Sequence, residues 1–276
     1  MLTVGKPTAS IVRWASSAAL LALAGCASAP KPIDKIPSGP LRAATAAEVL
    51  SAYDAYAQAV RTLSASGELE LRDRRRGESR RFALRLLAAR DGRLYLKASL
   101  AVVTALEVVA DGQTFWFQVP SRKTVWTGPA TARGTFSDTR EPYFALRPVD
   151  IVAALLPEPL APAADESLLL EGDREGFSLA VGPARAGGVV PRRRVWVERD
   201  TLLPSRARSY AASGDVELDV RFASWQDGLP RTVEVARPID GYEARFEFSK
   251  LQCDANLPSA AFLPRTPEGY RQVTVQ

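Results

Sequence analysis

The feature that most constrains this chain of 276 residues is a repeated alternation of apolar and polar residues. Val216, Leu218, Val220 and Phe222, for example, alternate with charged residues, which is typical of a strand with one buried side. Such segments recur roughly every 8 to 12 residues without the helices that parallel strands require, and Asp-Gly or Ser-Gly pairs indicate turns between them. We therefore expect a mainly β fold with a single curled antiparallel sheet, or a half-open β-barrel, of about eleven strands.

Two segments depart from this alternation and predict helices. Thr45 to Glu48 forms a capping box, and the apolar residues that follow have a spacing near 3.6 up to Leu63, where we expect the first helix to end. A mid-domain helix is expected from about Val149 to Leu156, between two prolines. Both would plug or cover the sheet. We expect residues 43–276 to form one domain and the proline-rich tail after Pro258 to pack irregularly.

The N-terminus has the features of a bacterial lipoprotein signal peptide, predicted for residues 1–25. Lys6 and Arg13 precede an apolar segment that is too short to span a bilayer. This segment ends in Leu-Ala-Gly-Cys, which resembles the lipobox in which the cysteine is lipidated, so Cys26 is the predicted lipidation site. The alternative is an ordinary secretory signal that is cleaved near Ala29.

Residues 26–42 are rich in proline and predict an extended tether between the lipid and the domain. A lipoprotein cysteine carries several acyl chains by resemblance, and two or more chains anchor a protein stably. Ala27 follows the cysteine, as in an outer-membrane sorting signal. We therefore expect a lipid-anchored protein in the cell envelope of a Gram-negative-type bacterium, at the outer membrane and facing the periplasm.

The composition excludes several classes of function. The chain contains no His, which rules out His-based triads and His-liganded metal sites, and its two cysteines cannot form a four-cysteine zinc site. No Gly-x-Ser-x-Gly motif is present, and the acidic residues lie mainly on the polar side of strand patterns. We therefore expect no enzyme, no metal and no cofactor. The formal charge of +5 comes without an aromatic basic motif, so we expect no nucleic acid as partner, and a monomer.

Three stretches resemble the LolA/LolB superfamily of periplasmic lipoprotein carriers. They are a pair of strand patterns around an apolar loop, the mid-domain helix, and paired C-terminal strand patterns: residues 92–113, 146–157 and 229–248. The turn after the helix departs from the family, because Leu156 or Glu158 stands where a glycine is expected. The lipidation site makes the chain nearer to LolB than to LolA, which is a soluble carrier. The resemblance implies a half-open barrel that binds acyl chains of lipoproteins or other lipids, receives cargo from a soluble periplasmic carrier and helps to insert it into the membrane.

The interior of such a barrel is the candidate ligand site. A barrel of about eleven strands is too wide for its strand side chains alone to fill, so helices fill it or a cavity remains. A cavity would suit acyl chains, which gain about 0.8 kcal/mol per buried methylene. The residues alone favour a filled interior, and the family resemblance favours a cavity. The candidate lining residues are Phe82, Leu84, Leu96, Leu106, Phe115, Phe117, Val220, Phe222, Phe246 and Phe248.

An uncharged segment, residues 100–105, lies between two strand patterns where a polar connection is expected. An exposed apolar tip would mark a contact with a membrane or a partner. In LolB a loop with an exposed leucine lies at the matching place and helps to deliver cargo. The resemblance therefore makes Leu100, supported by Val102 and Val103, the candidate membrane contact. The alternative is one long buried strand over residues 100–110.

One group of arginines lies in an expected hairpin turn around Gly77, and a second follows an expected loop at Gly187-Gly188. Each group is either a solvated tip, or a basic surface that contacts anionic head groups or an acidic partner. The attraction of such a surface to an anionic membrane is about 1 kcal/mol per charge. The residues are Arg74, Arg75 and Arg76, and Arg192, Arg193 and Arg194. Cys253 is most simply a small buried hydrophobic residue.

The sequence thus favours a LolB-like outer-membrane lipoprotein. Two alternatives remain: a structural envelope lipoprotein with a filled barrel, and a periplasmic domain that senses lipids or mislocalised lipoproteins. The sensor is less favoured because the sequence predicts no transmembrane helix and no second signalling domain.

Overall fold

The computed structural model describes residues 41–131 and 147–275. The predicted signal peptide, Cys26 and nearly all of the tether lie outside these residues. The described residues belong to one compact unit, Leu41–Gln276. Within them, no helix is long and apolar enough to cross a membrane.

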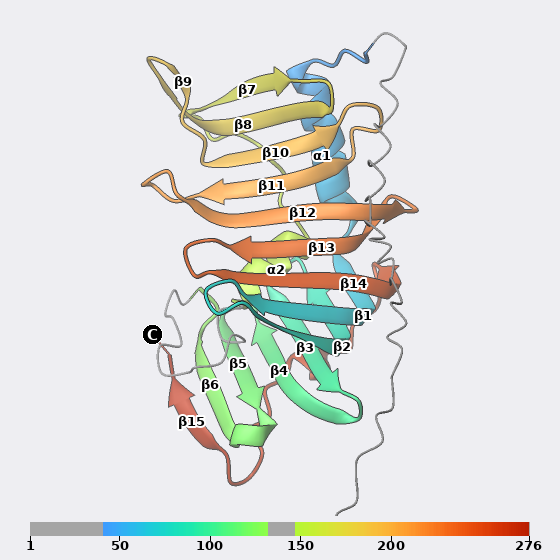
Figure 1. The fold of residues 1–276 in the computed structure, drawn as a ribbon, viewed down its shortest axis with the longest axis vertical. Helices are drawn as coiled ribbons and strands as arrows, with labels where there is room; N and C mark the ends of the chain where they lie inside the picture. The colour runs from blue at the N-terminus through green and yellow to red at the C-terminus, as the bar shows by residue number, and fades with distance from the viewer. Residues whose placement is uncertain (1–40, 132–146, 276) are drawn as a thin grey trace, which may run out of the picture. The chain divides into compact units, whose positions relative to one another are not determined.

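The unit consists of one large sheet with helices against it (Figure 1). Its strands are ordered β15-β6-β5-β4-β3-β2-β1-β14-β13-β12-β11-β10-β8-β7, and the short β9 pairs with β8. The helical elements are α1 (Ala46–Ala59), η1 (Pro120–Arg122), α2 (Pro148–Leu155) and η3 (Ser259–Phe262). The strands are β1 (Thr62–Asp73), β2 (Glu78–Ala89), β3 (Arg93–Leu100), β4 (Val103–Asp111), β5 (Thr114–Val119), β6 (Thr124–Pro129), β7 (Glu166–Gly172), β8 (Gly176–Arg185), β9 (Gly188–Val189), β10 (Arg193–Glu198), β11 (Pro204–Tyr210), β12 (Val216–Gln226), β13 (Leu229–Arg237), β14 (Tyr242–Cys253) and β15 (Arg271–Thr274).

The sheet confirms the expected fold class. Neighbouring strands are antiparallel except β15, and β1 is joined in the middle of the sheet to β14, with Leu69 opposite Phe246. The 15 described strands exceed the expected number of about eleven. The expectation of an irregular C-terminal tail is wrong for residues 271–274, because Arg271 to Thr274 form a parallel strand beside β6.

The first helix begins as predicted but ends earlier. Thr45 Oγ1 accepts a hydrogen bond from the Glu48 amide at 3.3 Å, and Glu48 Oε2 accepts one from the Thr45 amide at 2.7 Å. The expectation that this helix reaches Leu63 is wrong, because Val60 is already extended and Thr62 begins β1. Valine and threonine favour strands, and the main chain of Thr62 pairs with Ala89 at the end of β2. The mid-domain helix α2 is confirmed to within one residue at each end.

Two apolar clusters lie between the sheet and its helices, and in Figure 1 both helices lie behind the strands. α1 packs through Val49, Tyr53 and Ala57 against the end of the sheet that contains β7, β8 and β10. α2 packs through its apolar side chains against the larger cluster, which is formed by β1 to β6 and β12 to β14. The opposite side of the sheet carries polar side chains, because successive residues of a strand point to opposite sides.

Candidate functional site

The ten residues expected to line a cavity lie together in the larger apolar cluster, and none is more than 7% exposed. Strand register explains part of this arrangement. Phe82, Leu69, Phe246, Val233 and Phe222 lie opposite one another on five successive strands, from β2 to β12. The sides of these five strands that were predicted to face inward therefore form one continuous apolar surface.

Helix α2 covers this surface and fills much of the interior. Ile151 and Ala154 are fully buried in the same cluster, with Val152 and Leu155 beside them. A cavity of about 20 Å³ remains where the C-terminal ends of the two helices meet the sheet. This is room for about one water molecule, far below the roughly 300–1,000 Å³ of ordinary ligand pockets. Of the ten expected lining residues, Phe248 borders this cavity.

The walls of the small cavity are otherwise residues that the sequence did not mark as lining a ligand site. They come from the end of α1, the start of β1, the turn after β2, the turn after α2 and the strands β13 and β14. They are Tyr56, Ala57, Val60, Leu63, Arg90, Leu155, Leu156, Pro157, Leu229, Pro230, Val233 and Leu251. All but Arg90 are apolar or aromatic, so the cavity extends the apolar interior towards the helix ends.

Arg90 holds the two helix ends together at this cavity. Its guanidinium donates to the carbonyl oxygens of Val60 at 2.7 Å and Pro157 at 2.9 Å, and also to that of Ala57. The free carbonyls at a helix C-terminus favour such a cation. In addition, Asp54 Oδ1 accepts a hydrogen bond from the Leu160 amide at 2.7 Å. The cavity is thus closed by a few polar contacts between segments, rather than by the sheet itself.

Arg90 follows a buried apolar run and precedes the Asp91-Gly92 turn. In the sequence, an arginine beside a turn resembles an ordinary solvated residue. The sequence signal that could have marked it is its place directly after four consecutive apolar residues, Leu86 to Ala89, all of which are buried in the structure.

A second set of charged contacts fixes α2 to the sheet. Asp150 accepts from Arg147 Nε at 2.8 Å and from Arg237 Nη1 at 2.9 Å, while Arg237 Nε donates to Asp240 at 2.5 Å. Burial alone would lower the pKa of Arg237, but the two carboxylates outweigh it and hold that pKa above its usual value. The helix is therefore tied at its first turn by a buried, charged network.

The buried tyrosines and the described cysteine have little acid-base or nucleophilic capacity. Burial raises the pKa values of Tyr53, Tyr56 and Tyr242 well above their usual range, so these phenols stay protonated. Tyr56 instead packs edge-on against Phe222, with ring centres 6.0 Å apart. Burial also raises the pKa of the half-buried Cys253 thiol, which disfavours the reactive thiolate.

The uncharged segment forms the exposed tip of the β3–β4 hairpin. Leu100 lies opposite Val103, and the turn between them contains Ala101, which has a left-handed φ of 51°, and Val102. The exposed fractions are 51% for Leu100, 97% for Val102 and 65% for Val103. The alternative of one buried strand over residues 100–110 is therefore wrong. The tip is also shorter than the expected residues 100–105, since β4 already begins at Val103.

The two groups of arginines are engaged with neighbouring segments. Arg74 pairs with Glu243, Arg76 pairs with Asp73 at 3.6 Å, and Arg75 donates to the carbonyl of Ile239.

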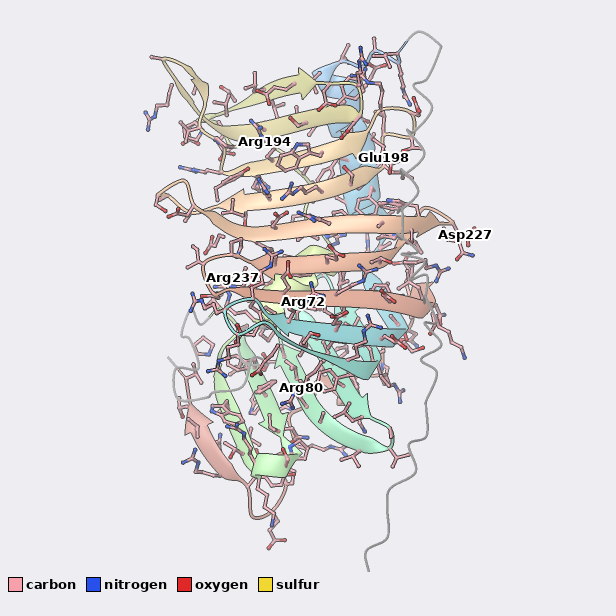
Figure 2. The ribbon with its side chains drawn as sticks, viewed as in Figure 1. Arg72, Arg80, Arg194, Glu198, Asp227 and Arg237 are labelled. Atoms are coloured by element: carbon pink, nitrogen blue, oxygen red, sulfur yellow. The ribbon has the colours of Figure 1, made fainter. Side chains whose placement is uncertain are left out.

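In the second group, Arg193 donates to the carbonyls of Pro159 at 3.2 Å and Ala161 at 3.1 Å. Arg192 pairs with Glu166 and Arg194 with Glu171. Figure 2 shows Arg194 on the side of the sheet that faces the viewer. Neither group is a set of unpaired charges, and both connect segments that are distant in sequence.

Known proteins share the fold. No protein-family model matches the chain, and no curated protein matches it either. Among solved structures, it is similar to a DUF1329 family protein from Desulfovibrio piger, with 18% identity, a TM-score of 0.51, and coverage of 79% of this chain and 95% of that one. A LolA superfamily protein from Nitrosomonas europaea matches with 13% identity, a TM-score of 0.49, and coverage of 80% and 99%. At these identities the similarity concerns the fold alone: a curled antiparallel sheet with helices against one side.

Proposed function

We propose that this chain is a LolB-like lipoprotein of the outer membrane, anchored through Cys26, that binds acyl chains between its sheet and its helices and helps to insert lipoproteins. The observation that carries the proposal is the way the apolar interior is closed. The interior holds a cavity of about 20 Å³, and the segments that cover its end are held by the hydrogen bonds of Arg90 and Asp54. Such contacts can break and re-form while the sheet stays intact.

The energies of opening and binding are comparable. Breaking the three hydrogen bonds of Arg90 costs about 1.5 to 3 kcal/mol each if the partners stay unpaired. An acyl chain gains about 0.8 kcal/mol per buried methylene, so on the order of ten methylenes offset the opening. A long acyl chain would therefore bind by displacing the helix ends, whereas a short chain would not.

The exposed tip of the β3–β4 hairpin supports a role in delivery. Leu100, Val102 and Val103 present apolar side chains to solvent at the end of two strands that belong to the same sheet. Inserting such side chains into the head-group boundary removes apolar surface from water, which is favourable. The tip lies at the end of β3, whereas Arg90 precedes the start of that strand, so the tip would hold the sheet at the membrane surface while cargo leaves the interior at the other end of β3.

Native mass spectrometry of residues 41–276, purified without detergent, tests acyl binding. We expect a bound lipid, or saturable binding of an added fluorescent fatty-acyl probe. A protein that carries no lipid and binds no probe would favour a second candidate function, a structural envelope lipoprotein. That candidate is supported by the dense packing of α2 in the interior, where Ile151 and Ala154 are fully buried.

A further inference from the structure

A depression lies on the side of the sheet opposite the apolar interior. It has a volume of about 640 Å³ and extends across six neighbouring strands, from β11 to β2. Seven arginines and five carboxylates line it, an excess of two positive charges. On β12, Asp219 and Arg221 point into the depression. The alternating residues Val220 and Phe222 point to the other side, into the apolar interior. The sheet therefore separates the two sites.

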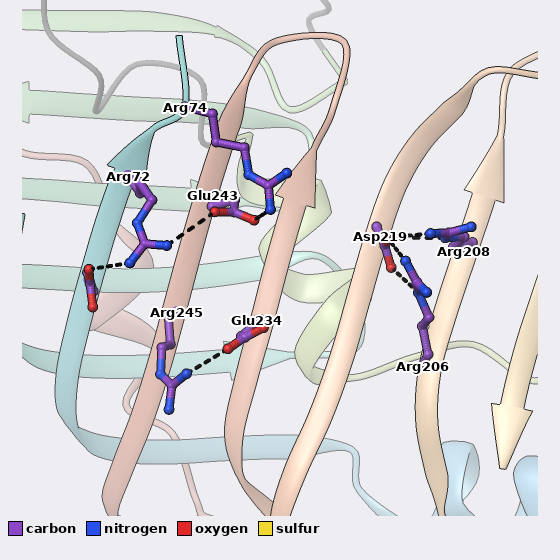
Figure 3. Close-up of polar contacts among 9 residues, drawn as sticks. Arg72, Arg74, Arg206, Arg208, Asp219, Glu234, Glu243 and Arg245 are labelled. Carbon is purple, nitrogen blue, oxygen red and sulfur yellow. Dashed lines mark hydrogen bonds and ion pairs between the residues drawn. The ribbon is translucent and has the colours of Figure 1, made fainter. Parts of the chain in front are cut away.

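Part of this charge is explained by pairing between strands. Glu234, Arg245, Glu70 and Arg81 lie opposite one another on β13, β14, β1 and β2, so that opposite charges alternate. Arg245 pairs with Glu234 at 2.7 Å and Arg81 with Glu70 at 3.3 Å (Figure 3 shows the first of these pairs). Such cross-strand pairs stabilise a sheet, and this half of the depression needs no ligand to account for it.

The alternation fails at the other end of the same row. Arg221 lies directly opposite Arg206 on β11, and like charges in this position are destabilising. Arg206 turns to Asp219, which it contacts at 2.7 Å and which Arg208 also contacts at 3.1 Å, as Figure 3 shows. Glu234, the neighbour of Arg221 on β13, pairs with Arg245 instead. Arg221 is exposed and makes no ion pair with any described residue.

A small side chain leaves space beside these arginines. In the next row of cross-strand neighbours, Ala236 on β13 lies between Asp219 on β12 and Glu243 on β14. Its two neighbours carry charged side chains, whereas Ala236 has only a methyl group. Two arginines hold Asp219, and Arg72 and Arg74 hold Glu243. The floor of the depression is thus open at Ala236, and the carboxylates on both sides of it are already neutralised.

We propose that this depression binds an acidic segment of a protein partner, with a carboxylate of the partner seated between Arg221 and Arg206. The planar guanidinium fork of Arg221 matches a carboxylate, whereas Arg206 already binds Asp219 through Nε and Nη2 and adds positive charge beside it. A bound anion would relieve the repulsion between the two arginines. A recess admits a protruding chain segment, whereas a flat bilayer would meet the rim. An acyl chain in the interior cannot carry its head group here, because the sheet lies between. The inference is independent of acyl binding.

Binding of a labelled peptide to the full chain, in low salt, tests the proposal. The probe is a fluorescein-labelled decapeptide of Glu, Asp and Gly, and the control peptide replaces each acid with its amide. We expect saturable binding of the acidic peptide, weakened about tenfold or more by Arg221→Gln because a charge-assisted hydrogen bond is lost. Added salt should weaken binding too. The thermal midpoint of R221Q should be unchanged or raised, because the like-charge pair is removed.

Arg85→Gln provides the matched control. Arg85 is exposed on the same side of the sheet, on β2, but does not line the depression. The proposal is supported if R85Q binds the peptide as the unchanged chain does. It is overturned if the acidic peptide does not bind, if the amide peptide binds equally, or if R85Q and R221Q weaken binding to the same extent. Arg221-dependent binding of anionic phospholipid vesicles without peptide binding would also overturn it, in favour of a membrane surface.

Discussion

Arg237 Nη1 donates to Asp150 Oδ2 at 2.9 Å, and the two residues are only 8% and 5% exposed. This pair joins the last residue of β13 to the first turn of α2, the helix that fills the interior. Placing two charges in an apolar surrounding has a desolvation cost that their attraction only partly repays. The main effect of the pair is therefore to fix the position of α2 against β13, and its net contribution to the free energy of unfolding is small.

Removing one partner of this pair should be costly. Asp150→Ala leaves the buried Arg237 and the half-buried Arg147 without this carboxylate, and we expect a loss of about 3 to 5 kcal/mol in the free energy of unfolding. The double change Asp150→Leu with Arg237→Met should lose less, because no unpaired buried charge remains between those positions. Urea unfolding followed by circular dichroism measures both. Equal losses in the two variants would show that the pair itself stabilises the fold.

Arg90→Met should loosen the closure of the interior. The variant keeps the apolar stem but loses the donors to three carbonyl oxygens, so α1 and the turn after α2 separate more readily. We expect faster uptake of a fluorescent fatty-acyl probe together with lower thermal stability. Arg61→Met, at an exposed arginine close in sequence to the end of α1, is the control for lost charge. Slower or unchanged uptake by R90M, at retained secondary structure, would contradict the role of Arg90.

Cys253 offers a pH-dependent measure of the same closure. In a protein of residues 41–276 it is the one cysteine, half-buried at the edge of the apolar cluster. Burial raises the pKa of the thiol above the usual 9.0, so the thiolate forms only as the pH rises beyond that value. Alkylation by iodoacetamide should thus be slow at pH 8, should increase steeply above pH 9, and should be faster in R90M. Rapid alkylation of the unchanged protein at pH 7 would contradict the burial of this thiol.

The sequence predicted the parts of the structure that depend on local pattern. The alternation from Val216 to Phe222 indicated both a strand and its inward side, and the capping box at Thr45 placed the start of α1. What it could not predict depends on contacts between distant segments. Asp150 and Arg237 are 87 residues apart, and nothing in either neighbourhood marks them as partners.

The register of the sheet was equally inaccessible. The end of α1 was misplaced because Val60 and Leu63 continue a helical spacing, although Val60 is extended and Leu63 pairs with Ala88 in the sheet. The like-charge pair of Arg206 and Arg221 follows from the register of β11 on β12, which single-strand patterns do not determine. Alternation alone likewise could not distinguish a filled interior from a cavity.

Cys26→Ser tests the predicted anchor. The thiol is the acceptor of the lipid, so the variant should lose acylation and accumulate as an unprocessed precursor or a released protein. Fractionation of cells, with metabolic labelling by a palmitate analogue, measures both effects. Cys253→Ser is the matched control and should remain lipidated. A C26S protein of mature size that still fractionates with membranes would disprove the lipoprotein assignment.

The hairpin tip gives a prediction that separates delivery from lipid binding. Leu100→Glu should change the free energy of unfolding by no more than about 0.5 kcal/mol, because the side chain is largely exposed. Probe binding should also persist, since the tip is not among the residues around the small cavity. Transfer of lipid into liposomes should slow about tenfold, because inserting a leucine side chain is worth about 1.5 to 3 kcal/mol and a carboxylate resists entry.

Ile239→Glu is the matched control for this change. Ile239 has the same exposed fraction as Leu100, 51%, but lies in the turn between β13 and β14. If both variants slow transfer equally, added negative charge alone accounts for the effect. If L100E loses several kcal/mol of stability, the side chain contributes to the fold in a way that its exposure does not indicate. If L100E keeps both its stability and its transfer rate, the tip is exposed but plays no part in delivery, and the LolB-like mechanism fails at its membrane contact.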